Sequence, residues 1–211
     1  MLFIIAAIFF LPVRAEAANL YFEPSKTNVA PGDEFQVRVL IDTEDKFINA
    51  IGGEVLTGGK FTITRVSDGN SIVNLWVERP RIESSSGSVS FSGITPGGFA
   101  GSDGLIMTLT IIADKTPGSR TGSLSFGKEA QVFISDGRGV PAPLTFGKAT
   151  LTIDPKRAKS EPLAVRDTVP PEEFTPEITR SPELFNNRYV LVFGTQDKRS
   201  GIDHYEVLEI R

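Results

Sequence analysis

Apolar and polar residues alternate with a period of two along most of the chain from residue 19 to residue 153. The clearest example is residues 35–42, which follow the turn Pro31-Gly32-Asp33 and carry an apolar side chain at every second position up to Ile41. This period is that of a half-buried β-strand, and no 3.6-residue apolar stripe indicates a helix. The pattern predicts strands at residues 20–22, 35–42, 48–56, 61–66, 72–78, 88–94, 104–113, 123–126, 131–134 and 144–153.

Turn-forming residues separate most of these predicted strands. Clusters of Gly, Pro, Asp and Asn at residues 57–59, 67–70, 96–98, 116–118 and 135–137 supply the positive φ angles that tight turns require. Short strands at spacings of roughly 8–12 residues, with Gly and Pro between them, are typical of an antiparallel β-sandwich. The sequence therefore predicts an all-β fold, an antiparallel jelly-roll sandwich of about nine strands.

The composition allows a packed core and excludes several classes of function. Of the 211 residues, 40% are hydrophobic, and the net charge of -4 comes without a basic stripe, which argues against nucleic-acid binding. Cysteine is absent, which excludes disulfides, thiolate metal sites and thiol redox catalysis. Burial of apolar side chains must therefore stabilise the domain.

The N-terminus predicts export. Residues 1–17 combine a nearly continuous apolar run with the A-x-A-type site Ala15-Glu16-Ala17, which indicates a signal peptide and hence a secreted or cell-surface protein without a membrane span in its mature part. No Lys or Arg precedes the apolar run, so either the start lies upstream or the chain begins within the signal. The other predicted regions are the sandwich at residues 19–153, a Pro-rich and charged linker at 154–169, and a partial, truncated β segment at 170–211.

Catalytic chemistry has little support. His204 is the only histidine, and on a predicted strand its neighbour Asp203 points to the opposite face, so it cannot orient the imidazole as a catalytic triad requires. A glycosidase needs two carboxylates about 5–10 Å apart in a cleft, whereas turn capping and solvated strand faces explain the acidic residues. The chain is predicted not to be an enzyme. The carboxylates considered for that role are Asp42, Glu54, Glu78, Glu83 and Asp103.

The sequence predicts no cofactor, and calcium is the one ion for which it offers suitable ligands. Asp42, Glu44 and Asp45 lie in one loop, and Asp103 lies in a second, glycine-rich loop; both could donate hard oxygen ligands. Neither loop has the Asp-x-Asp-x-Asp-Gly spacing, and stabilisation of turns explains both equally well.

Trp76, the only tryptophan, is the main candidate for a binding residue. If the aliphatic residues at positions 73, 75 and 77 face the core, period-two alternation exposes Trp76 together with Asn74 and Glu78. Exposed aromatic residues on sandwiches stack on sugars or anchor protein partners. Alternatively, a loop covers Trp76 or the strand faces the other way. The predicted recognition face also includes Asn49, Ile51 and Gly53 of the third strand.

The order of these segments resembles that of cohesin domains and the related carbohydrate-binding-module superfold. The resemblance rests on residues 20–24, 29–39, 48–55, 87–91, 104–111, 132–137 and 147–153. It implies a cohesin-like sandwich that binds a dockerin-like protein module or a polysaccharide. The tail, with residues 167–171 and 197–207 and predicted strands at 189–193 and 201–207, resembles the start of a bacterial immunoglobulin- or fibronectin-like module.

The sequence thus predicts a non-catalytic, extracellular binding or scaffolding module. The alternative is a purely structural spacer on a surface protein, and a glycan-active enzyme is a third and weaker reading.

Overall fold

The computed structural model describes residues 17–58, 60–116, 120–161, 168–180, 187–195, 197–199, 201–202 and 205–208. The predicted signal peptide therefore lies, except for Ala17, outside the described residues. Among the described residues, no helix is long and apolar enough to cross a membrane. The elements are β1 (Ala18–Pro24), β2 (Asn28–Val29), β3 (Glu34–Asp42), β4 (Ile48–Thr57), β5 (Phe61–Ser67), β6 (Leu75–Ile82), β7 (Val89–Phe99), β8 (Gly104–Ala113), β9 (Arg120–Phe126), β10 (Gln131–Ile134), β11 (Leu144–Phe146), β12 (Ala149–Ile153), β13 (Glu177–Arg180) and β14 (Tyr189–Val192).

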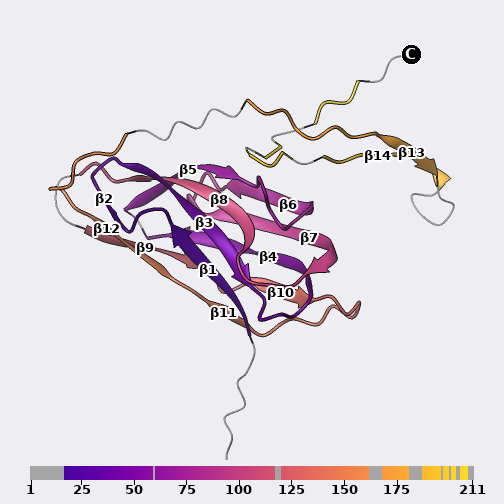
Figure 1. Cartoon of the computed structure of the whole chain (residues 1–211), viewed down its shortest axis with the longest axis horizontal. Helices are drawn as coiled ribbons and strands as arrows, with labels where there is room; N and C mark the ends of the chain where they lie inside the picture. The colour runs from indigo at the N-terminus through magenta and orange to yellow at the C-terminus, as the bar shows by residue number, and fades with distance from the viewer. Residues whose placement is uncertain are drawn as a thin grey trace, which may run out of the picture.

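Strands β1 to β12 form a sandwich of two sheets (Figure 1). The five-stranded sheet has the order β11-β1-β3-β8-β5, and the seven-stranded sheet has the order β2-β12-β9-β4-β7-β6 with β10 paired to β4. Neighbouring strands run antiparallel except in the pairs β1–β11 and β2–β12. The predicted all-β antiparallel sandwich is confirmed.

The alternation in β3 builds one half of the core. Phe35, Val37, Val39 and Ile41 are all fully buried between the sheets. The ring of Phe35 meets that of Phe61 on β5 edge to face, with 5.9 Å between the ring centroids. Each such buried side chain stabilises the fold by about 1.5–3 kcal/mol relative to an exposed one, which is how this sandwich holds together without disulfides.

The buried carboxylate of Asp33 fixes both the turn before β3 and the start of the linker. It accepts hydrogen bonds from the backbone N–H of Ala30 (3.0 Å) and from the backbone N–H and hydroxyl of Ser160 (2.8 and 3.1 Å). Burial alone would raise the pKa of Asp33, but these hydrogen bonds to its charged form outweigh burial and lower the pKa below its ordinary value. Lys26 also donates to the Ser160 hydroxyl (2.6 Å), so the first residues of the linker are attached to the sandwich.

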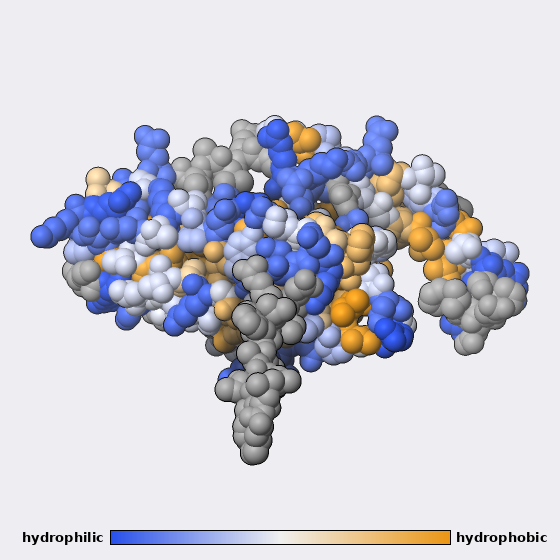
Figure 2. All heavy atoms as spheres, turned by 60° about the horizontal axis from the view of Figure 1, so that its bottom comes forward, coloured by the Kyte–Doolittle hydropathy of each residue, from blue (hydrophilic) through white to orange (hydrophobic). Residues whose placement is uncertain are grey.

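Beyond the linker, β13 and β14 pair as an antiparallel hairpin. The predicted strand at residues 189–193 is present as β14, but the prediction that it is a core strand is wrong, because Tyr189 in β14 and Ile178 in the paired strand β13 are each 73% exposed. A two-stranded ribbon has no second layer to cover its apolar residues. Figure 2 shows hydrophobic residues gathered on the side of the molecule that carries this hairpin.

The remaining tail has no further strand in the part of it that the structure describes. Residues 201–202 and 205–208 are irregular, so the strand predicted at 201–207 is not formed there. Asp203 and His204 lie outside the described residues. A single hairpin is too little to establish an immunoglobulin-like module, which stays a prediction.

Candidate functional site

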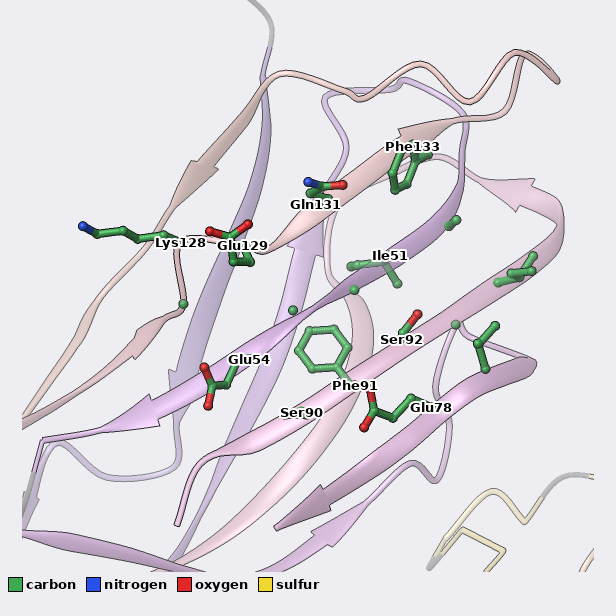
Figure 3. A pocket seen from close by; sticks show the side chains of 17 residues that line it. Ile51, Glu54, Glu78, Ser90, Phe91, Ser92, Lys128, Glu129, Gln131 and Phe133 are labelled. Carbon is green, nitrogen blue, oxygen red and sulfur yellow. The ribbon is translucent and has the colours of Figure 1, made fainter. Parts of the chain in front are cut away.

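The outer face of the seven-stranded sheet carries an open groove of about 680 Å³. It runs across β10, β4, β7 and β6, with Gln131 and Phe133 on one side and Glu78 on the other, as Figure 3 shows. The groove is lined by Ala50, Ile51, Gly52, Gly53, Glu54, Val77, Glu78, Ser90, Phe91, Ser92, Gly93, Ile94, Gly127, Lys128, Glu129, Gln131 and Phe133.

The groove exists because the outward positions of β4 and β7 carry small side chains. Ser90 and Ser92 alternate with the buried Val89 and Phe91, so their hydroxyls face outward. Gly52 pairs with Ser92 across the strands. A Cβ atom on Gly52 would stand 3.4 Å from the carbonyl oxygen of Phe91, an ordinary contact, so the fold does not require glycine there. Glycine at position 52 instead leaves this part of the sheet surface without a protruding side chain.

Three carboxylates and one ammonium group surround this floor. Glu54, Glu78 and Glu129 line the groove together with Lys128. Glu78 is already engaged, because it accepts a hydrogen bond from Arg81 at 3.1 Å. The excess of carboxylates makes the groove acidic, and it therefore favours a partner element that carries Lys or Arg.

Of the two orientations left open for the strand around Trp76, the structure shows the one in which the indole ring faces the core. Leu75 and Val77 are 55% and 73% exposed, whereas Trp76 is half-buried and packs against the core. The strand begins only at Leu75, so the buried Val73 belongs to an irregular segment and does not set the alternation of β6. Trp76 pairs with Gly93, whose missing side chain leaves room for the indole ring on the core side.

The other predicted recognition residues separate into different places. Ile51 lines the groove, but it is only 3% exposed and belongs to the core beneath the groove floor. Asn49 is half-buried at a bulge in β4 and does not line the groove. Gly53 and Glu78 line the groove, while Asn74 and Trp76 line a second hollow on the other side of β6. The predicted recognition residues are thus divided between the groove, the second hollow and the bulge in β4.

Sequence reasoning missed most of the groove. Ser90 and Ser92 sit at alternate positions of a correctly predicted strand, and this small polar pattern was a signal that could have been used. The contributions of Gln131 and Phe133 depend on β10 pairing with β4. The alternation of apolar and polar residues within either strand does not predict that pairing.

The carboxylates considered for calcium serve turns in this structure. Asp42 accepts a hydrogen bond from the backbone N–H of Glu44 at 2.9 Å. Glu44 and Asp45 both have positive φ angles, of 47° and 61°. Asp103 accepts the hydroxyl of Tyr21 at 2.6 Å, and burial followed by this contact raises the pKa of Tyr21 to about 12. Among the described residues, no three His, Cys, Asp or Glu side chains are placed to hold a metal ion.

No protein-family model matches this chain, and no curated protein matches it. Solved structures similar to the sandwich do exist. A chain in a type I cohesin–dockerin complex from Clostridium thermocellum superposes with a TM-score of 0.55 at 14% identity, covering 65% of this chain and 94% of that one. The seventh ScaB type I cohesin from Pseudobacteroides cellulosolvens gives a TM-score of 0.54 at 16% identity, covering 72% and 98%.

A third similar structure is a non-cellulosomal cohesin from the hyperthermophilic archaeon Archaeoglobus fulgidus. It gives a TM-score of 0.52 at 13% identity, covering 65% of this chain and 91% of that one. The sandwich therefore has the cohesin fold. The predicted resemblance to cohesins is confirmed at the level of the fold.

Proposed function

We propose that the sandwich is a non-catalytic binding module that holds a dockerin-like protein partner on the groove face of β10, β4, β7 and β6. The observation that carries this proposal is the open groove, in which Gly52, Ser90 and Ser92 keep the sheet surface low. A rigid element of a partner can lie across such a surface. Small-molecule sites, by contrast, enclose most of their ligand's surface, which this open face does not do.

The partner class is inferred from proteins with the same fold. The similar Clostridium thermocellum structure is described as a cohesin–dockerin complex, and another similar structure is the third ScaB cohesin of R. flavefaciens in complex with a group 1 dockerin. At 14% and 16% identity these chains share a fold with this one. Their partners support a protein ligand of the dockerin class for this module.

The chemistry of the groove suits such a protein partner. Leu75 and Val77 are exposed apolar residues at the β6 side, and Phe133 stands on the β10 side. Apolar and aromatic anchors contribute most of the affinity in protein interfaces, while the polar surroundings set orientation. Glu54 and Glu129 add charge that speeds and orients the encounter.

A polysaccharide ligand has less support. Sugar recognition by stacking needs an exposed aromatic platform, and Trp76, the candidate for that role, is half-buried against the core. We further infer that residues 19–153 form the binding unit and that it works outside the cell or at its surface, since residues 1–17 have the sequence of a signal peptide.

The test measures binding of the chain to a display library of dockerin modules, from which the best binder is purified. Ser92→Arg places a long side chain in the middle of the groove. Thr62→Arg places the same side chain at an exposed position on β5, in the opposite sheet. Ser92→Arg is expected to weaken the Kd by at least about 100-fold, or about 2.7 kcal/mol, and Thr62→Arg is expected to leave it within about twofold.

The possible results discriminate among the functions. A Kd that is unchanged by Ser92→Arg, or raised equally by both substitutions, contradicts the groove as the docking face. If no dockerin binds but the chain is retained in polysaccharide affinity gels, the ligand is a glycan. If neither binds, the spacer function is the better description.

A further inference from the structure

Strand β6 has a second hollow on its other side. This hollow has a volume of about 620 Å³ and is lined by residues from β6 and by residues that follow the linker. The post-linker residues are Glu172, Glu173, Phe193, Gly194, Thr195 and Tyr205. Figure 1 shows this part of the chain, in orange and yellow, running past β6. Residues of the sandwich and residues of the tail thus form this hollow together.

An apolar ridge separates this second hollow from the groove. Val77 lines both hollows, and together with Leu75 it forms the ridge, because these side chains are 73% and 55% exposed. A partner that lies across the groove and reaches over the ridge therefore meets the tail. A partner would bury both Leu75 and Val77 only if it contacted them from the groove and from the second hollow.

Close backbone packing holds the tail beside β6. A Cβ atom on Gly69, in the loop before β6, would stand 2.7 Å from the carbonyl oxygen of Arg199, so only glycine allows the tail this close. A side chain on Gly201 would overlap Asp68 in the same loop. Asp68 is in turn fixed by Arg79 of β6 through an ion pair of 2.8 Å. The position of the tail is therefore set by the same loop that leads into the ridge.

The aromatic side chains of the tail are held in place by one another. The ring centroids of Phe193 and Tyr205 lie 5.1 Å apart in an edge-to-face contact, and Phe174 contacts both rings. The Tyr205 hydroxyl donates to the Thr195 carbonyl (3.2 Å) and accepts from the Thr195 N–H (3.1 Å). A pre-ordered aromatic platform of this kind loses little side-chain entropy on binding.

We propose that the tail is part of the docking surface, and that one element of the dockerin-like partner straddles the Leu75–Val77 ridge and contacts Phe193 and Tyr205. This inference rests on the proposed function, since it extends the same face. The partner element would carry apolar side chains for the ridge. It would carry Lys or Arg on its flanks, because Glu54 and Glu129 lie on one side and Glu173 lies on the other.

The experiment uses the full chain and the dockerin purified from the library. The double substitution Phe193→Ala with Tyr205→Ala removes the platform, and Tyr189→Ala removes an exposed aromatic residue of the hairpin that lines neither hollow. We expect the double variant to weaken the Kd by about 10-fold or more and Tyr189→Ala to change it by less than about twofold. Ser92→Arg is measured in parallel.

Iodide quenching of Trp76 provides a second readout that does not depend on a variant folding. With a tryptophan-free form of the dockerin, complex formation is expected to protect Trp76, which lines the second hollow. Unchanged quenching and an unchanged Kd for the double variant, with binding still lost in Ser92→Arg, overturn the inference and leave the proposed function intact. Tighter binding by the double variant also overturns the inference, because it would mean that the aromatic side chains of the tail hinder the partner from docking on the groove face. Absence of any dockerin binder overturns both proposals.

Discussion

The orientation of β6 can be tested at Gly93, the residue of β7 that faces Trp76. A Cβ atom at position 93 would lie 2.9 Å from Cε3 of Trp76 and 3.0 Å from the carbonyl oxygen of Leu75, and it would overlap Val73. Contacts this short are not tolerated, so Gly93→Ala must displace either the indole ring or the backbone of β6.

The expected cost follows from overpacking. Adding a methyl group to a filled site typically lowers the free energy of unfolding by about 1–3 kcal/mol. Replacing glycine also reduces the entropy of the unfolded chain, which offsets about 0.4–1 kcal/mol of this loss. We therefore expect Gly93→Ala to lower the free energy of unfolding by about 1–2 kcal/mol. Trp76 emission should also shift to longer wavelength, because the displaced ring becomes more exposed to water.

Gly52→Ala on the neighbouring strand is the matched control. Its Cβ would meet Phe91 O and Ser92 Cβ at 3.4 and 3.5 Å, which are ordinary contacts. This variant should be as stable as the parent or up to about 1 kcal/mol more stable. Urea unfolding followed by Trp76 fluorescence measures both variants. Equal stability of the two, or unchanged emission in Gly93→Ala, would refute the packing of Trp76 over Gly93.

Three further predictions concern residues away from that contact. Because folding lowers the pKa of Asp33, its ionised form adds stability above the unfolded pKa of about 4, and this is lost as the pH falls through the folded value. Asp33→Asn should cost about 1–3 kcal/mol at pH 7 and flatten the loss of stability below about pH 4, as measured by urea unfolding. An ultraviolet titration should show one tyrosine ionising near pH 12 that is absent in Tyr21→Phe. Ile51→Ala should cost about 2–5 kcal/mol of stability, as a core residue does.

Local patterns were enough to predict the class of the fold. In β3 the alternating residues Phe35, Val37, Val39 and Ile41 are all buried as the pattern requires, and Leu40, beside an irregularity in the pairing with β8, is buried as well. The same rule failed at β6 because Val73 precedes the strand and because Gly93, on the next strand β7, leaves room for Trp76. Alternation tells which residues share a face, but what lies opposite a strand decides which face is buried.

The groove was harder to predict than the fold. Its small residues, Ser90 and Ser92, are visible in the sequence as outward positions of one strand. Their meaning appears only when β10 and β6 are placed on either side of β4 and β7. The second hollow depends on even longer-range contacts, since Trp76 and Tyr205 are far apart in the sequence and both line this hollow only because the tail packs close to Gly69.

The central claim is that a protein partner docks on the groove face of the seven-stranded sheet. Chemical-shift mapping by nuclear magnetic resonance tests it most directly, with the isotope-labelled chain titrated with the dockerin selected from the library. The account predicts the largest shifts at the backbone amides of Gly52, Ser92 and Glu129, and small shifts at Thr62 on the opposite sheet. Shifts concentrated on the outer face of β3, β5 and β8, with Gly52 and Ser92 unaffected, would contradict it.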